Sequence, residues 1–159
     1  YIFIYIYIMN NILWGPITWT LFHVLIEKTK EDSMPYIKHI LIHIITIICK
    51  ALPCPTCREH ASTLLEKYKH YQVLTSKTQL KNWLLGFHNV VNKKLNKPEF
   101  TYSQLEYYKR FHLNELVPLW QKHFIIMNHD LQVLIEKQNI ARTKNTVIKL
   151  LSVHRKHFT

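Results

Sequence analysis

Residues 35–57 read PYIKHILIHIITIICKALPCPTC, a strongly apolar segment that runs into a pair of closely spaced cysteines. Pro35 suits the first turn of a helix, where its missing N–H costs nothing. The apolar side chains that follow recur at helical spacing, at Ile37, Ile40, Leu41, Ile44, Ile45 and Ile48. Such a stripe gives a helix one face for a core. The apolar run is too short to cross a bilayer, so it predicts a buried core helix that ends near Leu52.

The stretch Cys54-Pro55-Thr56-Cys57 follows at the predicted start of the next helix. With Pro55 in the first helical position, the free amides and the positive end of the helix dipole face the sulfurs. This environment lowers a thiol pKa and favours the nucleophilic thiolate. The motif is therefore a candidate redox dithiol. Two alternatives share the same spacing, namely an ordinary disulfide and a zinc site.

Helical patterns continue on both sides of this stretch, and the 159 residues contain only two glycines. The pattern predicts an all-α chain. We expect helices over 17–28, over 77–95 after a Ser76 cap, and over a segment that begins at Thr101 or Ser103 and breaks or bends at Pro118. The remaining predicted helices run from Cys54 or Thr56 to about Tyr71, over 130–141 and over 143–156.

Composition narrows the class of protein. Three cysteines are too few for a disulfide-stapled secreted scaffold. A net charge of +11 favours an anionic partner, which could be nucleic acid, a membrane surface or a phosphate-bearing cofactor. The apolar, β-prone residues 1–8 precede Met9, which we interpret as the natural start, so that residues 1–8 are upstream or non-native sequence.

Three further patterns carry chemistry. The first is Trp14-Gly15-Pro16-Ile17-Thr18-Trp19 with His23 one turn later, which places an aromatic ring and an imidazole on one helical face. It also fits an ordinary amphipathic helix with tryptophans in the core. The second runs from Trp83 through His88, Asn89, Val91, Asn92 and Leu95 to Lys97-Pro98, and mixes polar side chains with an apolar stripe. Buried polar groups need partners, which a ligand rich in donors and acceptors would supply.

The third pattern is Cys49-x4-Cys54-x2-Cys57-x2-His60, which has the ligand types and spacing of a zinc site. Against this interpretation, Cys49 falls inside the predicted second helix. There it is more simply a small buried apolar residue.

Taken in order, these motifs resemble the Erv/ALR family of FAD-dependent sulfhydryl oxidases. The resemblance covers roughly residues 12–102, and the stretch from Leu52 to Ala61 looks most like the compact forms of large DNA viruses. It implies a four-helix bundle plus a short fifth helix, followed by a helical C-terminal extension. The corresponding domains are the segment 1–8, an FAD-binding oxidase domain over 9–102 and a basic extension over 103–159.

The resemblance also implies roles for individual residues. Cys54 would be the outer cysteine that a substrate thiolate attacks, and Cys57 would lie against the flavin, whose electrons then pass to O2 and give H2O2. The residues expected to bind FAD are Gly15, Thr18, Trp19, His23, His60, Trp83, His88, Asn89, Val91, Asn92, Leu95 and Lys97. No metal is expected.

The chain departs from the family pattern at several positions. A structural disulfide common in cellular members would need cysteines at Leu85 and Tyr102, and no second C-x-x-C is present. A relay would therefore use the client dithiol protein directly or a thioredoxin-like carrier. Asn96 stands where the family often has glycine before Lys-Pro, and asparagine also tolerates left-handed backbone.

The resemblance further implies a homodimer, located in the host cytoplasm or virion if viral, and otherwise in the mitochondrial intermembrane space or another oxidative-folding compartment. Residues 103–159 lie outside it, and their basic side chains could contact capsid proteins or nucleic acid or form a solvated face. An alternative function is a non-catalytic helical virion component, or a zinc-stabilised docking module that uses this extension.

Overall fold

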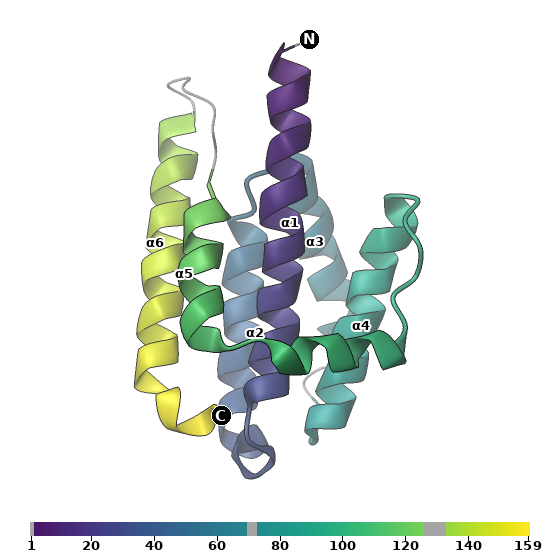
Figure 1. Cartoon of the computed structure of the whole chain (residues 1–159), viewed down its shortest axis with the longest axis vertical. Coiled ribbons are helices and arrows are strands. Elements are labelled where there is room, and N and C mark those ends of the chain that lie inside the picture. Colours follow the sequence, from purple (N-terminus) through teal and green to yellow (C-terminus); the bar gives the residue numbers. More distant parts are fainter. Residues whose placement is uncertain (1, 70–72, 126–132) are drawn as a thin grey trace.

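The computed structural model describes residues 2–69, 73–125 and 133–159, and these residues form helices and their connections without a β-strand. The first part is α1 (Ile2–Lys28), α2 (Met34–Lys50), α3 (Pro55–Lys67) and α4 (Lys77–Lys94). A 3-10 helix, η3 (Tyr102–Arg110), then crosses the front of the molecule and leads into α5 (Leu113–His123) and α6 (Val133–Val153) (Figure 1). The short 3-10 turns η1 (Glu31–Ser33) and η4 (Arg155–His157) complete the described elements. The predicted all-α class is confirmed.

Helices α1 to α4 enclose the core that positions the site. Pro35 and Pro55 each occupy the first turn of their helices, as predicted. Ser76 caps α4, and its side chain and that of Gln79 form a reciprocal capping box. The apolar stripe of α2 is buried at Ile37, Leu41, Ile44, Ile45 and Ile48, and Ile40 packs against it half-buried. Local capping signals and the apolar period therefore account for these elements.

Helix α1 is longer than the sequence predicted. A start at Ile17 was expected because proline favours the first turn of a helix, yet the helix begins at Ile2 and contains Pro16 in its interior. An internal proline removes one backbone N–H, and here it does not end the helix. The predicted domain boundary at Met9 falls inside α1, which projects beyond the rest of the bundle (Figure 1).

The break after the fifth predicted helix also lies elsewhere than expected. Phe111 and His112 have extended backbone and separate η3 from α5. Pro118, where the break was predicted, lies inside α5. The chain changes direction at Phe111 and His112, where the backbone leaves the helical conformation. Pro118 removes only one backbone N–H donor from α5.

The C-terminal helices belong to the same hydrophobic core as the four-helix part. Helix α5 packs along α1 and buries Leu116, Trp120 and Phe124, whereas α6 packs on α2 and buries Ile140 and Val147 (Figure 1). The helices predicted over 130–141 and 143–156 form one helix where they are described; residues 130–132 lie outside the described part, as do 70 and 71 of the predicted third helix.

The end of the chain returns to the end of α1. The Thr159 N–H donates to the Lys28 carbonyl at 2.7 Å, and the Lys30 N–H donates to the His157 carbonyl at 2.9 Å. None of the described helices combines the length and the apolarity needed to cross a bilayer.

Candidate functional site

Cys54 and Cys57 form a disulfide at the N-terminus of α3, with their Cα atoms 5.1 Å apart. Cys54 is the N-cap residue, and the Cys57 N–H donates to its Sγ at 3.2 Å. The Thr56 hydroxyl lies 3.3 Å from the same sulfur. The predicted placement of the motif at a helix start is confirmed. A thiolate formed on Cys54 would keep the backbone N–H as a donor, which favours the charged form.

The two cysteines differ in exposure. Cys54 is 2% exposed, whereas Cys57 is half-buried and packs at the edge of the core. The cysteine expected to face a flavin is therefore the more exposed residue of the two. Attack on Cys54 by a client requires the groups that cover it to move.

Cys49 takes no part in this pair. It is a free thiol buried inside α2, and burial raises its pKa to about 12. The sulfurs of Cys54 and Cys57 are bonded to each other, and the described residues contain no group of three or more His, Cys, Asp or Glu side chains that could hold a metal ion. The structure does not assemble the alternative zinc site with His60.

Aromatic side chains from α1, α4, the segment before η3 and η3 itself gather in one cluster. The Trp19 and His88 rings stack at 3.9 Å with an interplanar angle of 9°. The His23 ring stacks on Tyr108 at 4.6 Å, also at 9°, and Phe100 lies 5.5 Å from His88. The structure therefore brings together Trp19, His23 and His88, which the sequence analysis had singled out separately.

Phe100 and Tyr108 were missed by the sequence analysis. Both follow Lys97-Pro98, in a segment whose aromatic residues carry no helical or strand period of their own. The Asn89 hydrogen bonds place Phe100, and the crossing of η3 places Tyr108, against the histidines. Clustering of aromatics after a motif is a weak signal that could have drawn attention to them.

The two histidines are hydrogen-bonded to each other, with His23 Nε2 3.1 Å from His88 Nδ1. Burial lowers the pKa of His23 to about 3, helped by His88 and Lys81. Burial and the nearby Lys97 lower the pKa of His88 to about 4. Both rings are therefore neutral near pH 7, when one nitrogen can donate and the other accept. The cluster presents flat, uncharged rings.

Cations lie beside this cluster, at the C-terminal end of α4. Burial, together with Lys94, lowers the pKa of His60 on α3, and Lys97 acts in the same way on His88. Lys94 and Lys97 are both exposed. Asn96, between them, has a φ of 52°, so the left-handed turn expected there is confirmed. The turn leads into Lys97-Pro98. Lys94 and Lys97, on either side of it, supply positive charge that suits a phosphate group.

Several predicted binding residues have partners within the chain. The Asn89 amide donates to the Phe100 carbonyl and accepts from the Phe100 N–H, both at 2.8 Å. The Asn92 amide donates to the Pro98 carbonyl at 3.2 Å. We expected a ligand to satisfy these polar groups, and the segment 98–100 does so instead. Asn89 and Asn92 therefore hold this segment, and with it Phe100, against α4.

The other predicted binding residues vary in their surroundings. Thr18 Oγ1 donates to the Trp14 carbonyl at 2.7 Å, and Trp83 Nε1 donates to the Tyr68 carbonyl at 3.0 Å within the core. A Cβ on Gly15 would meet nothing within 4 Å, so there is open space beside it. Val91 is half-buried and Leu95 is 56% exposed, which leaves both available for contact.

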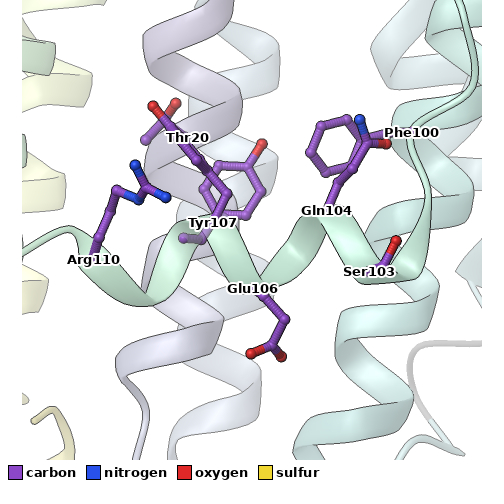
Figure 2. Close-up of a pocket in the computed structure, with 8 residues that line it drawn as sticks. Thr20, Phe100, Ser103, Gln104, Glu106, Tyr107 and Arg110 are labelled. Atoms are coloured by element: carbon purple, nitrogen blue, oxygen red, sulfur yellow. The ribbon is translucent and has the colours of Figure 1, made fainter.

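A hollow of about 490 Å³ lies along η3, between Phe100 and Arg110 (Figure 2). Thr20 and Tyr107 line its middle, and the Arg110 guanidinium lies over the Tyr107 ring at 4.2 Å. It shares Phe100 and Tyr108 with the aromatic cluster. Its lining contains neither a cysteine nor a predicted binding residue, so this hollow is separate from the dithiol.

Comparison with known proteins finds one matching family model and relatives named as FAD-linked sulfhydryl oxidases. The family model described as "Erv1 / Alr family" matches residues 16–112, more than half of the chain. An FAD-linked sulfhydryl oxidase of African swine fever virus (isolate Pig/Kenya/KEN-50/1950) is 32% identical over 91 residues, which cover 57% of this chain and 75% of the relative. The FAD-linked sulfhydryl oxidase ERV1 of Oryza sativa subsp. japonica is 31% identical over 86 residues, which cover 54% of this chain and 43% of the relative.

A protein of Invertebrate iridescent virus 3 whose name assigns the same activity, 096R, is 30% identical over 87 residues. This match covers 55% of the chain and 59% of the relative, so the chain spans less than two thirds of that protein. No solved structure matches the chain. The family-model match ends at residue 112, before α5 and α6.

Proposed function

The chain belongs to the Erv1/Alr family, and we propose that it is an FAD-dependent sulfhydryl oxidase that forms disulfides in client proteins. The observation that carries the proposal is the Cys54–Cys57 disulfide at the N-terminus of α3, inside the region that the family model matches. A dithiol at a helix start is suited to thiol–disulfide exchange, because the amides and the dipole favour the leaving thiolate.

The residues present fit a flavin dinucleotide. Trp19, His23 and His88 offer flat, neutral rings for stacking, and Gly15 has open space beside it. Lys97, with Lys94 nearby, provides positive charge for a pyrophosphate. The chemistry that bound FAD supplies is acceptance of an electron pair and its transfer to O2, which gives H2O2. We also assign FAD binding to the other residues that the family resemblance implies, namely Thr18, His60, Trp83, Val91 and Leu95. Asn89 and Asn92 would act indirectly, by holding the backbone of residues 98–100.

The dithiol exchanges with the client in two balanced steps. A client thiolate attacks the Cys54 sulfur, the Cys54–Cys57 bond breaks, and Cys57 leaves as a thiolate. The second client thiolate then attacks the mixed disulfide and releases Cys54. The client loses two electrons and two protons as its disulfide forms, and the Cys54/Cys57 pair takes them up as a dithiol. The Cys57 N–H, which already donates to Cys54 Sγ, stabilises negative charge on the released sulfur.

The partners follow from this chemistry. A dithiol client or a thioredoxin-like carrier supplies the electrons, and O2 accepts them. We extend the proposal to a homodimer in the host cytoplasm or in a virion, where capsid proteins or nucleic acid would meet the basic surface. Viral relatives support this location, and a mitochondrial relative from Schizosaccharomyces pombe supports the intermembrane space as the alternative.

The proposal is tested by visible absorption of the purified protein and by oxygen consumption after dithiothreitol is added. We expect flavin bands and O2 uptake in the wild-type protein. Cys57→Ser should keep the flavin and abolish turnover, because it removes one sulfur of the exchanging pair. Cys49→Ala is the matched control, and it should retain most of the activity since that thiol is buried outside the pair. A colourless protein that cannot be reconstituted with FAD would overturn the proposal.

A further inference from the structure

Arg58 connects three parts of the chain at the dithiol. It follows Cys57 directly, and its backbone N–H donates to the Cys54 carbonyl at 3.0 Å. Its Nη1 donates to the Leu52 carbonyl at 2.7 Å, in the linker that precedes Cys54. Its Nη2 donates to Glu136 Oε1, also at 2.7 Å. One guanidinium therefore ties the linker before the dithiol and the first turns of α3 to helix α6.

The environment makes this ion pair more than a surface contact. The side chains of Arg58 and Glu136 are 22% and 33% exposed, so both are partly withdrawn from water. The planar guanidinium uses separate nitrogens for the carbonyl and the carboxylate, which fixes its orientation. Glu136 lies in α6, outside the region that the family model matches. The contact thus links the family-matched region to a helix outside it.

We propose that Glu136 sets the redox poise of the Cys54–Cys57 dithiol through Arg58, which makes α6 a working part of the redox site. The inference rests on the proposed function, since it concerns the same dithiol. Glu136 is a positioning residue: it touches neither sulfur in the described contacts and acts through the charge and orientation of Arg58.

The direction of the effect follows from electrostatics. A cation close to a cysteine favours the thiolate and so stabilises the reduced dithiol, which raises the reduction potential of the disulfide. The Glu136 carboxylate offsets part of the Arg58 charge. With Glu136 in place, the disulfide is therefore harder to reduce than Arg58 alone would make it. Neutralising Glu136 and neutralising Arg58 should shift the equilibrium in opposite directions.

The test uses the full-length protein equilibrated without oxygen in buffers of reduced and oxidised glutathione. Two glutathione molecules are oxidised to one glutathione disulfide as each Cys54–Cys57 disulfide is reduced to the dithiol. After acid quenching and unfolding, alkylation is read by mass, and Cys49 is labelled in both forms. Glu136→Gln keeps an oxygen that can accept from Arg58. We expect it to raise the equilibrium constant for reduction by about three- to tenfold, where tenfold equals about 30 mV.

Arg58→Met removes the cation and leaves Glu136 charged, so the same equilibrium constant should fall. The double variant should return close to the wild-type value. Glu66→Gln is the matched control, because Glu66 pairs with Lys69 at the other end of α3, where the same loss of charge is remote from the dithiol. Far-ultraviolet circular dichroism establishes that each variant is folded.

If the Arg58–Glu136 ion pair only stabilised the fold, the variants would shift the reduction potential in another pattern. If both single variants move the potential in the same direction, or if Glu136→Gln behaves like Glu66→Gln, the proposal is overturned. These outcomes remain distinct from failure of the proposed function. A protein without flavin or O2 uptake fails as an oxidase, whereas its dithiol potential still tests Glu136. An active oxidase with an unmoved potential overturns the role of Glu136 alone.

Discussion

The hydrogen bond between His23 and His88 depends on protonation, because two imidazolium rings offer only donors to each other. The pKa values of about 3 and about 4 lie below the ordinary value of 6.5. The unfolded chain therefore binds more protons than the folded one between about pH 4 and pH 6.5. Stability from this pair is fully present above pH 6.5 and is lost as the pH falls through this window.

We predict that the free energy of unfolding decreases from pH 7 to pH 5, with each ring contributing up to about 1.4 kcal/mol per pH unit. Urea unfolding at a series of pH values measures the slope. His88→Gln should lower stability at pH 7, because its stacking on Trp19 is lost, and should make the slope shallower. If the free energy of unfolding of His88→Gln changes with pH as steeply as that of the wild-type protein, the interpretation of His23 and His88 as a neutral pair is wrong.

Gly15 provides a second prediction about a single residue, because a helical glycine with open space around it is usually better replaced by alanine. Gly15→Ala should stabilise the protein by less than the usual value of about 0.5–1 kcal/mol, because Pro16 disfavours a helical residue with a Cβ directly before it. If this space receives the flavin, as proposed, the same change should weaken FAD binding. Unfolding and FAD titration are measured together.

Gly86→Ala is the matched control for this prediction. Gly86 lies inside α4, its added Cβ also meets open space, and it is not among the proposed binding residues. It should stabilise the protein by about 0.5–1 kcal/mol, because no proline follows it, and leave FAD affinity unchanged. Equal FAD affinities for the two variants would remove Gly15 from the site.

Among the elements, η3 is attached to α4 mainly through the segment 98–100 that precedes it. Asn89 makes paired hydrogen bonds with the Phe100 backbone, just before η3, and Phe100 and Tyr108 complete the aromatic cluster. Asn89→Ala should cost about 1–3 kcal/mol, because it leaves partly buried backbone groups without partners. It should also speed hydrogen exchange over residues 100–111.

Asn82→Ala is the control for Asn89, because Asn82 is an exposed asparagine on the same helix. It should change neither stability nor exchange appreciably. If Asn89→Ala leaves exchange over 100–111 as slow as in the wild-type protein, then η3 is held by its apolar contacts at Leu105 and Tyr108 instead.

The same elements show what the sequence could predict. Helices α2, α3 and α4 begin at local signals, namely Pro35, Pro55 and the Ser76 cap, and the dithiol position followed from one of them. The extent of α1 through Pro16 and the turn at Phe111 depend on backbone conformations that no local signal specifies.

The candidate site divides in a similar way. Trp19, His23 and His88 could be predicted as site residues from the sequence, because the residues within each motif are spaced so that they share one helical face. Their partners Phe100 and Tyr108 could not, because tertiary contacts of η3 and of the segment before it bring these rings to the histidines. Arg58 and Glu136 are separated by 78 residues, and only the packing of α6 brings them together.

At the scale of the whole molecule, the basic C-terminal region contributes buried side chains to the hydrophobic core as well as a solvent-exposed face. Helix α6 is exposed at most positions yet buries Ile140 and Val147, and α5 buries Trp120 and Phe124 completely. The chain end is hydrogen-bonded to the end of α1. These contacts predict that the family domain and the extension unfold as one cooperative unit.

Val147→Ala tests this prediction, because Val147 is fully buried on α6 and lies far in sequence from the dithiol. Removing its methyl groups should cost about 1–3 kcal/mol. In a cooperative molecule the loss should move the unfolding midpoint equally by tryptophan fluorescence, which reports α1, α4 and α5, by far-ultraviolet circular dichroism and by release of flavin. Val153→Ala makes the same chemical change on α6 at a side chain that is 65% exposed, so its midpoint should stay near that of the wild-type protein. If Val147→Ala shifts the helical signal and leaves the fluorescence and flavin transitions in place, α6 unfolds on its own. Its influence on the dithiol would then be confined to the Arg58–Glu136 contact.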